Sequence, residues 1–164
     1  MMLRAENKAY QILERYWHGT VPVDPAGIAR AMGIIVRGEN PAVMPSKLGN
    51  DSGYYEKMEG NSPLILFNTM DNAVRQRYAI AHALGHHVLD HGQVFKDNPQ
   101  SFNVYNFSNE EIEANAFAAA LLMPRRYVEI IVDRVTDVVR LAETFGVSQV
   151  AMAYRSKQLG IIRA

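Results

Sequence analysis

The sequence contains no cysteine, carries no net charge and has no apolar run long enough to cross a membrane. The absence of cysteine excludes disulfide bonds and thiolate metal sites. Lys and Arg total 17, as do Asp and Glu, so the chain as a whole does not attract nucleic acid or an anionic membrane. The first eight residues are too polar for a signal peptide. We therefore expect a cytoplasmic protein with no membrane partner.

The length and the apolar content together predict a folded globular chain. For 164 residues the expected count is one domain, and a hydrophobic fraction of 48% supports a real core. We expect a single domain over residues 1–164, with the main core in 1–124 and further helices in 125–164.

The pattern of elements favours an α+β fold that is mostly helical. Apolar spacing predicts an amphipathic helix over residues 3–17, and Asp24 followed by Pro25 predicts the start of a second helix. Three short β-rich runs, 34–36, 53–56 and 64–67, predict a small three-stranded sheet. An edge of this sheet would either bind a peptide by strand addition or only support the helices. Residues 92–107 are polar and are expected to form a long loop.

Four of the five histidines fall within residues 78–91, an alanine-rich run that predicts a helix ending near Gly92. His82 and His86 are four apart and therefore share one face, whose other residues are small or apolar. Two imidazoles one turn apart on a buried face suit a divalent metal. The alternative is a pair of core histidines that bond to the backbone. His87 and His91 are also four apart, on a neighbouring face, where they would orient the ligands or simply lie at the surface.

The residue after the first of these histidines departs from a known motif. In His-Glu-x-x-His, the glutamate activates the metal-bound water. The corresponding position here is Ala83. The metal-binding half of the motif is therefore present and the catalytic half is missing.

A second helix is expected to supply a carboxylate ligand. The residues from Ser108 to Glu111 form a capping-box pattern, and the helix they begin should end at Pro124. Glu113 lies on an otherwise apolar face, where a carboxylate requires a partner. Two histidines and a glutamate form a known catalytic zinc set that leaves one position for water. The alternative is an interaction of Glu113 with the helix dipole, a role that Glu110 and Glu111 already fill.

The last part of the chain has helix-turn-helix character over residues 141–160. Residues 125–164 hold seven Lys or Arg against four Asp or Glu, but only Arg155 and Lys157 lie on the helix that would read DNA. So few charges favour packing over DNA binding. Three further side chains, Tyr54, Tyr55 and Tyr105, would stabilise a developing oxyanion if they lined a cleft; otherwise they pack in the core.

Two blocks resemble the ImmA/IrrE family of metallopeptidases. Residues 77–86, RYAIAHALGH, are similar to that family's RFTIAHELGH segment, and residues 113–124, EANAFAAALLMP, are similar to its EANxFAAxLLMP block. The general layout of the rest of the chain is also similar.

The resemblance implies a zincin-like fold with zinc ligands at His82, His86 and Glu113, and a general-base position at Ala83. Zinc is the expected ion, although manganese or another divalent ion suits the same ligands. Known members cut helix-turn-helix repressors, so the implied function is an endopeptidase acting on such a repressor.

Alanine at position 83 cannot move a proton, so the resemblance implies an inactive form. One explanation is a deliberately inactivated variant, and the retention of the residues on either side of position 83 favours it. The other is a natural pseudoprotease that acts as a protein-binding antirepressor or antitoxin-like module.

Overall fold

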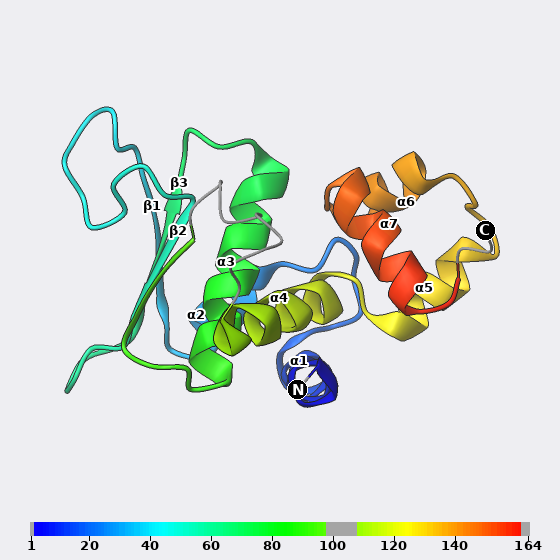
Figure 1. The fold of residues 1–164 in the computed structure, drawn as a ribbon, viewed down its shortest axis with the longest axis horizontal. Coiled ribbons are helices and arrows are strands. Elements are labelled where there is room, and N and C mark those ends of the chain that lie inside the picture. Colours follow the sequence, from blue (N-terminus) through cyan, green and yellow to red (C-terminus); the bar gives the residue numbers. More distant parts are fainter. Residues whose placement is uncertain (1, 98–107, 162–164) are drawn as a thin grey trace.

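The computed structural model describes residues 2–97 and 108–161, and it confirms a mostly helical α+β fold (Figure 1). In this part of the chain the helices are α1 (Met2–Tyr16), α2 (Pro25–Ala31), α3 (Ala73–Val88), α4 (Asn109–Leu122), α5 (Arg125–Val132), α6 (Val138–Phe145) and α7 (Gln149–Gln158). The strands are β1 (Ile35–Glu39), β2 (Gly53–Glu56), β3 (Leu64–Asn68) and β4 (Val94–Asp97).

The sheet has one strand more than the sequence predicted. Its order is β1-β3-β2-β4, with β1 parallel to β3 and β2 antiparallel to both β3 and β4. The added strand, β4, lies in the stretch predicted to be a loop and pairs with β2 from Glu56↔Val94 to Gly53↔Asp97. This pairing joins segments about 40 residues apart, so the local pattern of charged and apolar residues does not reveal it.

Helix starts follow the capping signals in the sequence. Asp24, Asn72, Ser108 and Ser148 each accept a hydrogen bond from a backbone N–H in the first turn of the helix that follows. Gly146 ends α6 in the left-handed conformation, as the predicted helix-turn-helix requires. These caps fix where α3 and α4 begin, and hence which side chains meet between them.

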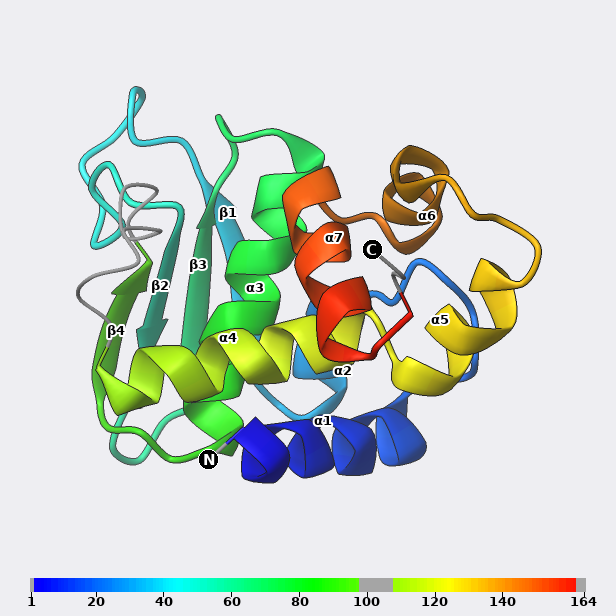
Figure 2. The ribbon, with the colours of Figure 1, turned by 45° about the vertical axis from the view of Figure 1, so that its right-hand side comes forward.

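Helix α3 lies between the sheet and α4, which crosses it and also packs on α1 (Figure 2). Gly85 lies where α3 and α4 are closest: a Cβ there would stand 3.1 Å from the Ala114 carbonyl oxygen and 3.2 Å from its Cα. The missing side chain lets the two helices approach closely. This crossing brings the first turns of α4 over the histidines of α3.

Two arginines attach the last three helices to this core. Arg77 of α3 donates to the carbonyl oxygens of Gly146 (Nε, 3.1 Å) and Val23. Arg155 of α7 is buried and donates to the Met123 carbonyl oxygen at 3.1 Å and to the Glu6 carboxylate at 3.0 Å. The helix-turn-helix segment is therefore bonded to α1 and α3.

Among the residues that the structure describes, none of the helices combines the length and the apolar character that a membrane span requires.

Candidate metal centre

The histidine helix ends earlier than the sequence suggested. α3 stops at Val88 with Leu89 as its C-cap, and Asp90 then takes a positive φ of 55°. The backbone N–H of His91 donates to the His86 carbonyl oxygen at 3.1 Å. His91 therefore does not continue the helix beside His87; the turn brings it back against His86.

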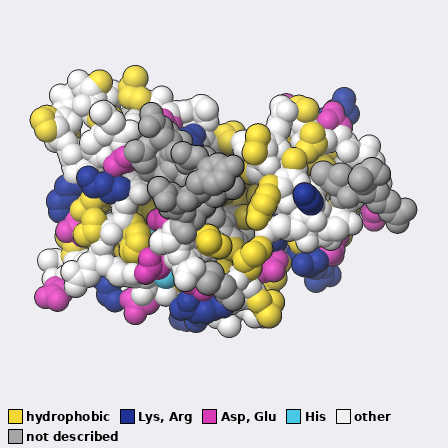
Figure 3. Space-filling view, viewed as in Figure 1, with side chains coloured by type: hydrophobic (Ala, Val, Ile, Leu, Met, Phe, Trp, Pro, Cys, Tyr) yellow, Lys and Arg dark blue, Asp and Glu magenta, His cyan; other side chains and the backbone are white. Residues whose placement is uncertain are grey.

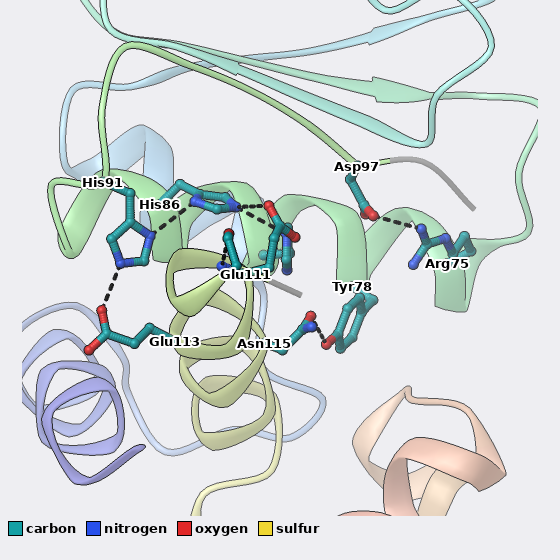
Figure 4. A network of polar contacts seen from close by, with 10 residues as sticks. Arg75, Tyr78, His86, His91, Asp97, Glu111, Glu113 and Asn115 are labelled. Atoms are coloured by element: carbon teal, nitrogen blue, oxygen red, sulfur yellow. Dashed lines mark hydrogen bonds and ion pairs between the residues drawn. The ribbon is translucent and has the colours of Figure 1, made fainter. Parts of the chain in front are cut away.

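Three side chains converge between α3 and α4 (Figure 4). Figure 4 shows His86 of α3 pointing towards Glu111 of α4. His82 and His86 are 3% and 1% exposed, in agreement with the predicted inward face. Their Nε2 atoms are 3.1 Å apart. Each Nε2 also lies 3.1 Å from a different carboxylate oxygen of Glu111. Within the described residues, this is the one group of three His, Asp or Glu side chains arranged to hold a metal ion.

The structure brings Glu111, rather than Glu113, to the two imidazoles. Successive helix residues are rotated by about 100°, so side chains two positions apart project to nearly opposite sides. Glu113 points towards α1 and bonds to Arg4 and His91, each at 2.9 Å. Because α4 is buried on most of its circumference, the apolar pattern does not show which of its faces meets α3.

A signal in the sequence could have found Glu111. Glu111 and Asn115 are four apart and therefore share a face of α4. The Tyr78 hydroxyl donates to the Asn115 side-chain oxygen at 2.7 Å, and the Tyr78 ring stacks near His82 with ring centroids 6.2 Å apart. Of the three glutamates in α4, only Glu111 has a polar residue four positions later, and this polar pair indicates the face that meets α3.

The three groups perturb one another electrostatically. For Glu111, burial acts to raise the pKa, but the hydrogen bonds with His82 and His86 outweigh it and hold the pKa far below its ordinary value. For His82, burial acts to lower the pKa, yet the bond to Glu111 and the charge of Asp97 leave it raised. For His86, burial prevails and the pKa is lowered. The Glu111 carboxylate is therefore ionised and accepts hydrogen bonds from the imidazoles.

The donor set fits a divalent cation. Ligands at about 2.0–2.1 Å from a tetrahedral ion lie about 3.3 Å from one another, close to the 3.1 Å separations of these atoms. Two imidazole nitrogens that face each other at this distance repel unless a proton or a cation lies between them. Two histidines and one glutamate leave a fourth position for water.

The remaining predicted residues lie around this cluster or away from it. His91 bonds to His86, with their Nδ1 atoms 3.0 Å apart. His87 bonds through Nδ1 to the hydroxyl of Tyr55 at 2.9 Å, and burial together with the charge of Asp90 raises the pKa of Tyr55 to about 12. Tyr54 is buried and donates to Glu56 at 3.1 Å. Tyr54 and Tyr55 thus pack in the core, and Tyr105 lies outside the described residues.

One wall of the site is an edge of the sheet. Phe95 of β4 stacks on His86 with ring centroids 3.8 Å apart and planes 12° apart. Among the strands of residues 2–97 and 108–161, β4 is the last of the sheet, so none of these strands pairs with its outer backbone groups. Ala83 is 4% exposed and belongs to the main core.

A histidine-bearing helix, a second helix that crosses it with a carboxylate, and a small mixed sheet define a zincin-like fold of the metallopeptidase type. The family model of the IrrE N-terminal-like domain, Peptidase_M78, matches residues 37–157, and the chain belongs to this family. No curated protein matches the sequence. The matched range includes the histidines of α3 and the whole of α4.

Proposed function

We propose that this chain is a zinc-dependent endopeptidase domain whose metal is held by His82, His86 and Glu111. The convergence of these three side chains from two helices carries the proposal. Its substrate class is a helix-turn-helix repressor, an expectation that rests on the family resemblance of the sequence. The absence of cysteine fits a cytoplasmic location.

The groups of the site would have separate roles in peptide hydrolysis. A bound cation supplies Lewis acidity: it polarises the scissile carbonyl and lowers the pKa of its water. The buried imidazoles of His82 and His86 and the carboxylate of Glu111 would hold that cation. The outer edge of β4, which no other described strand pairs with, lies beside His86 and would offer backbone hydrogen bonds to an extended peptide.

Position 83 is where this chain departs from a working peptidase. A carboxylate there would accept the proton of the water and pass it to the leaving amine, whereas a methyl group does neither. Loss of such a group costs on the order of 10²- to 10⁴-fold in rate. With its three ligands and its sheet edge in place, the chain would still hold a cation and a peptide but would turn over substrate very slowly.

The test is to restore the missing group. Ala83→Glu, incubated with zinc and the repressor encoded nearest to this gene, should cut that repressor about 10²- to 10⁴-fold faster than the unmodified chain. Ala83→Gln is the matched control, since it has nearly the same size and accepts no proton. If Ala83→Glu binds both zinc and the repressor but cuts no faster than Ala83→Gln, the peptidase proposal fails.

A second candidate function is a non-catalytic binding module, and the alanine at position 83 favours it. A genomic alanine codon at this position, together with repressor binding that does not require cleavage, would support an antirepressor or antitoxin-like role. A glutamate codon would instead identify the chain as an inactivated variant.

Direct DNA reading by α7 is not favoured. Of its two cations, Arg155 is 3% exposed and bonds to Met123 and Glu6, which leaves Lys157. On the face shown in Figure 3, basic side chains are interspersed with acidic ones rather than gathered over one element. Tight, sequence-selective and salt-dependent binding in a mobility-shift assay would reverse this conclusion.

A further inference from the structure

His91 closes a chain of hydrogen bonds that ends on a proposed metal ligand. The turn at Asp90 returns the backbone towards α3, so that the Nδ1 atoms of His91 and His86 lie 3.0 Å apart. On its other side, the Nε2 of His91 lies 2.9 Å from the Glu113 carboxylate. Figure 4 shows His91 between His86 and Glu113. The His91 side chain is 4% exposed, so water has little access to these bonds.

The acceptor at one end of this chain fixes the proton positions along it. An ionised carboxylate only accepts hydrogen bonds, so the Nε2 of His91 must donate to Glu113. A neutral His91 then has its lone pair on Nδ1, and the Nδ1 of His86 must donate to it. When a cation replaces the proton that bonds the Nε2 of His86 to Glu111, the lone pair of His86 lies on Nε2, the atom that faces His82 and Glu111.

The carboxylate at the far end is itself held in place. Arg4 of α1 donates from Nη1 to Glu113 at 2.9 Å and from Nη2 to the Leu89 carbonyl oxygen at 3.1 Å. Its second bond reaches the turn that carries His91. The guanidinium of Arg4 forms an ion pair with the Glu113 carboxylate, and an ionised carboxylate only accepts hydrogen bonds.

We propose that His91, braced by Glu113 and Arg4, is a positioning residue that holds His86 in the tautomer and orientation in which its Nε2 binds the cation. This role rests on the metal centre proposed above. It assigns Glu113 to the support of a ligand instead of to the ligand set. A hydrogen-bonded partner on the far nitrogen of a ligating imidazole fixes the ring and raises its basicity, and loss of such a partner costs about 10- to 100-fold in metal affinity.

The test compares variants of His91 that keep or remove the acceptor. In His91→Asn the amide oxygen stands near the position of Nδ1 and still accepts from His86, whereas His91→Leu is apolar. Zinc affinity of the full chain is measured by competition with a chromophoric chelator, and thermal unfolding of the metal-free forms reports whether each variant folds. His87→Asn is the matched control on the neighbouring histidine, which bonds to Tyr55 and not to the proposed ligands.

We expect His91→Leu to bind zinc about 10- to 100-fold more weakly than the unmodified chain. His91→Asn and His87→Asn should bind zinc about as tightly as the unmodified chain. Glu113→Leu, which removes the acceptor for the His91 Nε2, is a second variant that tests the same chain and should also weaken zinc binding. Equal zinc affinity in the unmodified chain, His91→Leu and Glu113→Leu overturns the positioning role alone. A chain that takes up no zinc at all overturns the metal centre as well.

Discussion

The choice between Glu111 and Glu113 as the third ligand leads to a sharp prediction. Glu111→Gln removes a charged oxygen that lies 3.1 Å from each imidazole Nε2, whereas Glu113→Gln keeps a neutral acceptor for His91. A lost ligand should weaken zinc binding by at least the roughly 100-fold that is the upper range for a lost supporting residue. Glu113→Gln should weaken zinc binding by about tenfold or less.

The magnitude follows from binding linkage. Zinc at about 100 times its dissociation constant stabilises the folded chain by about 2.7 kcal/mol. For a chain of this size that raises Tm by roughly 5–11 °C, at about 2–4 °C per kcal/mol. If Glu111→Gln binds about 100-fold more weakly, the same zinc concentration stabilises it by about 0.4 kcal/mol, or roughly 1–2 °C.

The assay is thermal unfolding of each variant with chelator and with zinc, so each protein serves as its own metal-free reference. Glu110→Gln is the matched control, because Glu110 lies exposed on the same turn of α4. The reasoning is refuted if Glu113→Gln loses the zinc-dependent rise in Tm while Glu111→Gln keeps it. That result would return Glu113 to the ligand set that the sequence indicated.

Three other predictions concern pH and packing. In the metal-free chain, the lowered pKa of Glu111 stabilises the fold at pH values above 4.5, the ordinary pKa of a glutamate. The raised pKa of His82 stabilises the fold below pH 6.5, the ordinary pKa of a histidine, and this contribution is lost as the pH rises through the pKa of His82 in the folded chain. The Tm difference between the metal-free chain and Glu111→Gln should therefore be largest between pH 4.5 and 6.5 and should shrink above it; a constant difference contradicts the pairing. Gly85→Ala should destabilise the chain by about 1–3 kcal/mol, because its Cβ meets the α4 backbone at 3.1 Å; a higher Tm, as helix propensity alone predicts, would show that the helices yield. Arg77→Ala should lower stability by at least about 2 kcal/mol through lost bonds to Val23 and Gly146, with zinc affinity measured by chelator competition unchanged.

The sequence predicts those parts of the site that depend on local spacing. His82 and His86 lie on one face of any helix, and their inward orientation follows from the small residues around them. Helix starts at Asp24 and Ser108 are equally local, since each cap acts within one turn. The structure confirms these features because the local spacing that predicts them also produces them.

The parts that the sequence did not predict depend on contacts between distant segments. β4 exists because β2 pairs with it, which no local pattern reports. The rotation of α4 is set by its packing against α1 and α3 on opposite sides, so an apolar helix alone does not distinguish the face of Glu111 from that of Glu113. A helix that ends at Gly92 would place His91 on the face of His87. The positive φ of Asp90 turns the chain before that point, so this placement of His91 is wrong.

The reach of Arg4 has a practical consequence for the preparation of this protein. Arg4 lies in the first turn of α1, and terminal turns of helices are prone to fray. A tag or deletion that unwinds this turn would remove the bond from Arg4 to Glu113. Glu113 would then hold His91, and through it His86, less firmly. Batches that differ only in their N-terminal extension should therefore differ in how firmly they retain zinc during dialysis.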